Sequence, residues 1–269
     1  SGCCRGARGG FVDLSGKAFG EAARAVNDDG PHILVNLDGW TSAPLINEIM
    51  ALGPAPVQLL FKGFAGTSGM SEHHGIVGDR VATPPELARF MTERLVLLPH
   101  SYHFNGHEHL YPRLHGPDSL PRVERAALAA GKYLLQNNPA RPSLPLPREA
   151  ARSKGPLLCN FNQFYKFTPE VWAAWMRILQ AVPDATLWLL AWNDDGKLAL
   201  EELAEDEVGP GRLAFTTFFE EEWHVAAKGA CDLFVDTSPY AAHGTAADAL
   251  FAGVPVRPDA NEYVYKYIK

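Results

Sequence analysis

The chain has 269 residues, of which 24 are Lys or Arg and 31 are Asp or Glu, so its formal net charge is −7. This acidic balance argues against nucleic acid as the main partner, because phosphate backbones are bound by clustered Lys and Arg. No apolar run approaches the roughly 18 residues of a membrane-spanning helix, and four cysteines are too few for a disulfide scaffold. We therefore expect a globular protein that binds neither nucleic acid nor a membrane.

Short apolar runs alternate with helical segments in the first half of the chain. Four runs have the length and composition of buried strands, at residues 32–37, 57–61, 74–77 and 94–98. Between them we expect a helix around residues 44–52 and a second helix that opens at Thr83 with Thr-Pro-Pro-Glu. The runs lack strict alternation of polar and apolar residues, which indicates a parallel sheet covered on both faces.

A change of composition separates the two halves. Residues 120–136 have the pattern of one amphipathic helix, and residues 140–156 are rich in proline and charge, which is typical of a linker. We therefore predict four parts: a first lobe at 11–139, a linker at 140–156, a second lobe at 157–256 and a divergent tail at 257–269.

The alternation resumes after the linker. Strands are predicted at residues 157–161, 186–191, 213–217 and 233–236. Helices are predicted at residues 168–181, 198–204, 220–229 and 245–252, and Thr168-Pro169 fits the cap and first turn of the first one. The fold class is therefore α/β, with two Rossmann-like lobes and parallel sheets that face a cleft. Ligands of such sheets bind outside the carboxyl ends of the strands.

The four cysteines fall into two groups. Cys159 and Cys231 lie in apolar runs, so we expect buried free thiols, which fits a reducing compartment. Cys3 and Cys4 lie in a start rich in glycine and arginine, which indicates a disordered leader.

The strongest candidate site lies after the last predicted strand. A loop there carries His243, Gly244 and Thr245, and a helix follows. The free N–H groups and positive dipole end of a helix start attract anions, and a glycine lets a phosphate approach the backbone. Asp248, one turn later, fits an acceptor for sugar hydroxyls. The plain alternative is a capped helix with a polar first turn.

Two further loops follow predicted strands. In LCNFNQFYKFTP, a strand ends and Asn160, Asn162, Gln163 and Lys166 follow it, and the lysine fits a phosphate contact. The alternative for this loop is a solvated turn. The loop from Gly63 to Gly69 is rich in glycine, and a plain turn is its default interpretation.

The histidines suggest a competing hypothesis. His100, His103, His107 and His109 are dense, and His73-His74 adds two more, so the count would suit zinc. The spacing matches no helical or finger pattern, and proline and glycine surround the segment. A surface loop is therefore favoured, and we expect no metal.

These stretches together resemble the catalytic region of protein O-GlcNAc transferases, glycosyltransferase family 41. The resemblance is carried by FVDLS, HILVNLDGW, GPAPVQLLFKGFAGTSG, LCNFNQFYKFTP, LQAVPDATLWLL and the His-Gly-Thr segment through AGVP. It implies a GT-B fold and transfer of N-acetylglucosamine from UDP-GlcNAc to Ser and Thr hydroxyls of nuclear and cytosolic proteins. It also implies that the partners are protein acceptors and a UDP-sugar, with no cofactor and no metal.

The resemblance also implies roles for single residues. Lys166 matches the lysine that supports the leaving group, and Gln163 matches a diphosphate contact. His224 matches the histidine beside the uridine, and His243-Gly244-Thr245 matches the phosphate-binding segment. Asp248 matches a ribose-binding aspartate. Lys62, Gly63 and Ala65 fall on the loop that lines the sugar.

The chain departs from the family pattern in places. Lys62-Gly63-Phe64-Ala65 replaces a Leu-Gly-Tyr-Pro loop, Gly244 replaces a hydroxyl residue, and Glu221 and Ala227 replace basic residues. Nothing upstream of Phe11 matches the first strand and the active-site histidine of the family, so the sequence resembles a catalytic region that is incomplete at both ends. Two alternatives stay open: an inactive nucleotide-sugar-binding remnant, and a protein O-fucosyltransferase of the SPINDLY type.

Overall fold

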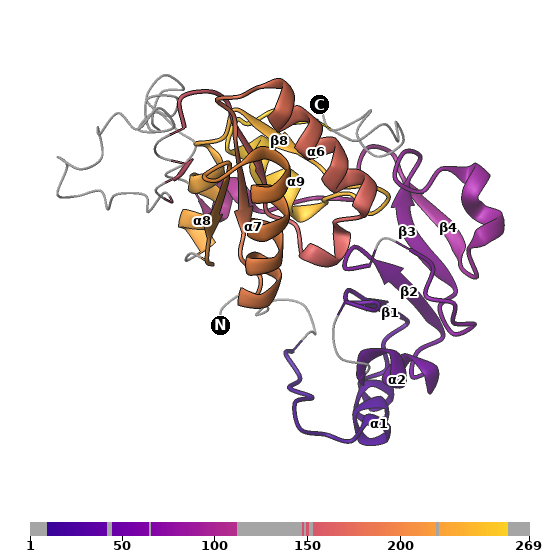
Figure 1. The fold of residues 1–269 in the computed structure, drawn as a ribbon. Coiled ribbons are helices and arrows are strands. Elements are labelled where there is room, and N and C mark those ends of the chain that lie inside the picture. Colours follow the sequence, from indigo (N-terminus) through magenta and orange to yellow (C-terminus); the bar gives the residue numbers. More distant parts are fainter. Residues whose placement is uncertain are drawn as a thin grey trace. The chain divides into compact units, whose positions relative to one another are not determined.

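The computed structural model describes residues 10–41, 45–64, 66–111, 147, 149–150, 153–218 and 221–257. The chain divides into two compact units, residues 1–104 and residues 105–269, and Figure 1 labels many of their elements. Each unit is built around one parallel sheet. The helix predicted at 120–136 and most of the linker predicted at 140–156 lie outside the described residues, so both stay predictions.

The first unit contains a four-stranded parallel sheet with the order β1-β2-β3-β4. Its strands are β1 (Ile33–Asn36), β2 (Val57–Phe61), β3 (Gly75–Asp79) and β4 (Arg94–Leu98). Its helices are α1 (Phe19–Asp29), α2 (Leu45–Ala51) and the 3₁₀ helix η1 (Pro85–Phe90). Ala22 and Ala23 of α1 pack with Ile49 of α2 in a small core. All four predicted strands are confirmed, and the helix expected at Thr83 is the short η1.

The second unit contains a five-stranded parallel sheet with the order β7-β6-β5-β8-β9. Its strands are β5 (Leu157–Asn160), β6 (Thr186–Leu190), β7 (Leu213–Thr216), β8 (Leu233–Val235) and β9 (Val256–Arg257). Its helices are α3 (His107–Leu110), η2 (Phe164–Lys166), α6 (Pro169–Ala181), α7 (Asp194–Val208), α8 (Glu221–Lys228) and α9 (Gly244–Phe251). The four predicted strands and four predicted helices of this half are confirmed, and α7 is longer than expected.

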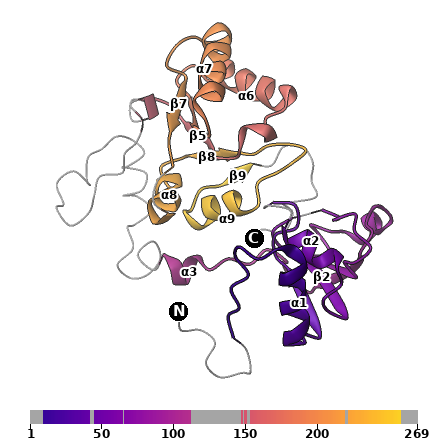
Figure 2. The same cartoon turned by 90° about the horizontal axis from the view of Figure 1, so that it is seen from below.

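Both faces of the second sheet are covered, as the apolar runs predict. Along β6, Leu187 and Leu189 belong to one core cluster, which includes Trp175 of α6. Trp188, between them, belongs to the other cluster, which includes Ala246 of α9. Figure 2 shows α6 and α7 on one side of the strands and α8 and α9 on the other. Because strand side chains alternate in direction, each strand contributes to both cores.

The order of this sheet creates a switch point. Strands β5, β6 and β7 extend the sheet in one direction, whereas β8 and β9 extend it on the other side of β5. The connections that leave β5 and β8 therefore diverge at their carboxyl ends. In open α/β sheets this is where ligands bind.

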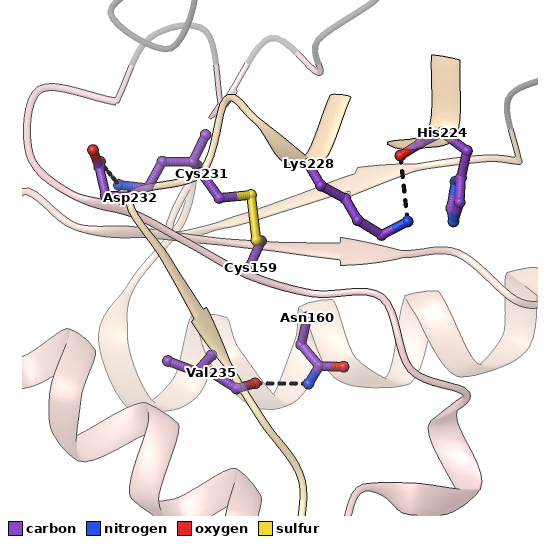
Figure 3. The surroundings of a disulfide bond; sticks show 8 residues. Cys159, Asn160, His224, Lys228, Cys231, Asp232 and Val235 are labelled. Atoms are coloured by element: carbon purple, nitrogen blue, oxygen red, sulfur yellow. Dashed lines mark hydrogen bonds between the residues drawn. A yellow bond between two sulfur atoms is a disulfide. The ribbon is translucent and has the colours of Figure 1, made fainter. Parts of the chain in front are cut away.

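The prediction of two free thiols in this unit was wrong. Cys159 of β5 and Cys231, which lies between α8 and β8, form a disulfide bond (Figure 3). Both residues are buried, as expected, but the fold brings together two positions that are 72 residues apart. These two cysteines therefore do not indicate a reducing compartment. Of the helices in the described ranges, none is both long and apolar enough to cross a membrane.

Candidate functional site

The carboxyl ends of β5 and β8 are joined by asparagine side chains. The Asn160 Nδ2 donates to the carbonyl oxygen of Val235 at 2.7 Å (Figure 3). The Asn162 Nδ2 donates to the Asp236 carboxylate at 3.1 Å and to the Thr237 Oγ1 at 2.9 Å. The two loops that the sequence singled out separately, after residue 160 and after residue 235, therefore meet at the switch point.

Asp236 organises the loop that leads to α9. Its carboxylate accepts hydrogen bonds from the backbone N–H of Thr237 at 2.7 Å and of Ala242 at 2.9 Å. Burial raises the pKa of Asp236, and these hydrogen bonds act in the opposite direction. The side chain thus fixes both ends of a tight loop just before the helix that carries the predicted anion site.

Lys166 lies beside this loop. It ends η2, and its Nζ donates to the carbonyl oxygen of Ala241 at 3.2 Å and lies 4.1 Å from the centre of the Tyr240 ring. Burial lowers the pKa of Lys166, whereas the charge of Asp236 raises it. Gln163, which precedes η2, is exposed. A partly desolvated ammonium at the switch point is placed to interact strongly with an anion.

The start of α9 is also suited to bind an anion. His243 is the N-cap residue, and its side chain makes no capping hydrogen bond. Gly244 is exposed, and a Cβ built there would meet no atom within 4 Å, so the space beside this glycine is open. The first N–H groups and the helix dipole favour an anion at this point.

His224 of α8 lies among aromatic rings. Its ring centre is 6.0 Å from that of Phe161 and 6.4 Å from that of Phe218. Burial and, to a smaller extent, the nearby Lys228 charge lower the pKa of His224 to about 4, whereas Asp248 acts in the opposite direction. The imidazole is therefore neutral at pH 7 and can contact a flat, uncharged ring such as a nucleobase.

Asp248 has protein partners at both of its carboxylate oxygens. Its Oδ1 lies 2.8 Å from the His107 Nε2, and its Oδ2 lies 3.0 Å from the Lys228 Nζ. Neither partner of Asp248 was predicted from the sequence. His107 was grouped with neighbouring histidines as a possible zinc ligand, and nothing in the spacing of Lys228 indicates that it is buried. No group of three or more His, Cys, Asp or Glu side chains within the described ranges is placed to hold a metal ion.

The remaining predicted residues follow β2 in the first unit. A Cβ at Gly63 would collide with the backbone oxygen of Leu37, so close packing alone requires this glycine. Lys62 has a left-handed backbone conformation, with φ of 70°, and its Nζ donates to the carbonyl oxygen of Phe104 at 2.7 Å. Ala65 lies outside the described residues.

Comparisons with known proteins agree with the two-unit α/β architecture. The model of the family described as "Glycosyl transferase family 41" matches residues 5–138 and 139–263. The chain is 31% identical over 247 residues to the probable UDP-N-acetylglucosamine–peptide N-acetylglucosaminyltransferase SEC of Arabidopsis thaliana, covering 91% of the chain and 23% of that protein. It is 27% identical over 248 residues to a protein of Oryza sativa subsp. japonica that carries the same probable activity and the name SPINDLY, covering 90% and 23%.

A solved structure extends the comparison to the fold. The O-GlcNAc transferase of Thermobaculum terrenum, in a mutant form, superimposes with a TM-score of 0.68 at 27% identity, covering 91% of this chain and 41% of that one. The fold is thus of the GT-B type, with two parallel sheets. The chain spans about a quarter of the length of the curated relatives that it matches.

Proposed function

The chain belongs to glycosyl transferase family 41, and on that premise we propose that it transfers N-acetylglucosamine from UDP-GlcNAc to Ser and Thr hydroxyls of proteins. The acceptors would be cytoplasmic or nuclear proteins. The proposal extends to this chain the activity in the name of the Arabidopsis relative, which is 31% identical over 91% of the chain.

One structural observation carries the proposal. The Lys166 ammonium and the start of α9, which has no side-chain cap, lie on the two loops that diverge at the switch point of the second sheet. Transfer from a nucleoside diphosphate sugar expels a diphosphate, so negative charge develops on the leaving group. A fixed cation and a helix N-terminus stabilise that charge without reorganisation, and they can take the place of a metal ion.

The other residues would surround the donor. We assign the diphosphate to Lys166, Gln163 and the His243-Gly244-Thr245 segment. The neutral His224 would contact the uracil ring, and Asp248 would lie near the ribose. We place Gly63 and Ala65 of the first unit on the sugar side, on the strength of the family resemblance alone.

The alternative function differs in the donor sugar. The family resemblance includes protein O-fucosyltransferases of the SPINDLY type. A few hydroxyl contacts decide sugar choice, so the family does not fix it. We propose N-acetylglucosamine as the donor sugar because the names of the SEC and SPINDLY relatives both carry that activity, and O-fucosyl transfer is the alternative.

A transfer assay tests the proposal. The chain is incubated with a Ser/Thr-rich peptide and radiolabelled UDP-GlcNAc or GDP-fucose, and labelled peptide is counted. We expect label from UDP-GlcNAc and a loss of at least about 100-fold in Lys166→Ala, the range seen when a group that stabilises developing charge is removed. The surface variant Lys197→Ala is the control. Transfer from GDP-fucose would support the alternative, and no transfer from either donor by a folded chain would favour an inactive remnant.

A further inference from the structure

Lys228 is a lysine without solvent exposure. It is the last residue of α8, and 0% of its side chain is exposed. Its Nζ donates to the carbonyl oxygen of His224 at 3.3 Å (Figure 3) and to the Asp248 Oδ2 at 3.0 Å. The Phe161 ring lies 5.4 Å from the same ammonium. Burying an unpaired ammonium costs free energy of folding, so the contacts of this lysine indicate its role in the fold.

These contacts connect two helices. Lys228 and the His224 carbonyl belong to α8, whereas Asp248 belongs to α9, whose start carries the proposed diphosphate site. A third element is attached through the other carboxylate oxygen, because the His107 Nε2 of α3 lies 2.8 Å from the Asp248 Oδ1. The His107 ring also stacks on Phe251 at 4.8 Å between ring centres. The carboxylate is therefore the point at which α3, α8 and α9 meet.

The pair also has an electrostatic consequence. Asp248 lies only one turn after the helix start, and its side chain is 21% exposed. In a partly desolvated site, an unpaired carboxylate would repel an incoming diphosphate over this distance. With Lys228 in place, the pair is neutral, and the attraction of Lys166 and the helix start is not opposed.

We infer that Lys228 is a positioning residue of the proposed nucleotide site, which orients the Asp248 side chain and neutralises its carboxylate beside the diphosphate. The inference rests on the proposed function. Lys228 itself would not touch the ligand, since its ammonium is fully enclosed. Its effect on UDP binding would pass through the Asp248 carboxylate, to which it donates a hydrogen bond.

The test compares two lysine–carboxylate pairs in the same chain. Lys228→Met removes the buried cation. Lys197→Met is the matched control, because Lys197 is exposed and pairs with Glu201 of the same helix at 3.8 Å. Each protein is titrated with UDP by calorimetry at pH 7. The pKa of the His224 imidazole is measured by NMR in the same samples without ligand.

We expect Lys228→Met to weaken UDP binding by at least about tenfold, and Lys197→Met to leave it unchanged. The pKa of His224 should rise by about one unit or more from its value near 4 in Lys228→Met only. The reason is that the variant loses the cation of α8, which lowers this pKa, and keeps the anion of α9, which raises it. A role in packing alone would predict no recovery of UDP affinity when the opposite charge of Asp248 is removed as well.

A second variant keeps the test decisive if Lys228→Met fails to fold. Lys228→Met combined with Asp248→Asn removes both buried charges and keeps an accepting oxygen at position 248. We expect this double variant to fold and to bind UDP more tightly than the single variant. Wild-type affinity in folded Lys228→Met, or a folded double variant that binds no better than the single one, would overturn the inference. A folded wild-type chain that does not bind UDP would refute the proposed function and the inference with it.

Discussion

At the scale of single residues, Gly63 has a physical explanation that needs no ligand. It follows β2, and the space where a side chain would begin is occupied by the backbone oxygen of Leu37. The family resemblance places the same residue on a loop that lines the sugar. The structure adds that this loop must pass directly against the segment after β1, which fixes its course whether or not a sugar is bound.

Gly63→Ala should therefore destabilise the first unit. Because a backbone atom cannot rotate away as a side chain can, we expect a loss of about 2 kcal/mol or more in the free energy of unfolding, measured with urea. Gly20→Ala is the control: Gly20 lies in the first turn of α1 and a Cβ there meets nothing within 4 Å. We expect that variant to be slightly more stable than wild type, by about 0.5 kcal/mol. Equal stability of the two variants would contradict the packing argument.

The sequence predicts which residue types lie at strand ends, but not which of them are partners. Asn162 and Lys166 could be singled out because they follow an apolar run. Their contacts with Thr237 and Ala241 could not, since these depend on β8 lying beside β5. Lys228 carries no signal at all, because a lysine at the end of a helix is normally solvated.

At the scale of helices and strands, an element could be predicted where its sequence carries a clear cap or a clear apolar pattern. Helix α6 begins where Thr168 and Pro169 indicate, and the Thr168 hydroxyl accepts from the Val171 N–H at 3.4 Å. Helix α1 was missed because its buried residues are Ala22 and Ala23, which give little apolar contrast, and Ala18 provides no side-chain cap. Helix α7 is longer than predicted because Asn193 caps it, accepting from the Gly196 N–H at 2.7 Å.

The disulfide links elements that the chain order separates. Cys159 and Cys231 close a segment of 72 residues that includes β6, β7 and α8. Closing such a loop restricts the unfolded chain, which corresponds to about 4 kcal/mol of stability in the chain-entropy model. The bond therefore contributes substantially to the second unit.

Reduction should accordingly lower the resistance of the second unit to urea. Unfolding is followed by tryptophan fluorescence with and without a phosphine reductant, and we expect the reduced protein to lose about 2–4 kcal/mol. The Cys159→Ala, Cys231→Ala double variant should be as unstable as the reduced protein and insensitive to the reductant. Identical unfolding curves for the oxidised and reduced wild-type chain would contradict this expectation.

At the scale of the whole molecule, the α/β class with two parallel sheets follows from the alternation of apolar runs and helical segments. The strand order does not, because alternation is the same for every order in which parallel strands can be arranged. It is the order β7-β6-β5-β8-β9 that brings the two polar loops to one point. The family resemblance and the switch-point geometry both lead us to propose these loops as the site.

The proposed function depends on the binding of a nucleoside diphosphate to the second unit through Lys166 and the start of α9. Calorimetric titration of the chain with UDP tests it most directly, with Lys166→Ala as the variant and Lys197→Ala as the control. We predict saturable binding by wild type and by the control, and a loss of at least about tenfold in affinity in Lys166→Ala, because one charge-assisted contact is removed. Equal UDP affinity in folded wild type and folded Lys166→Ala would contradict the account.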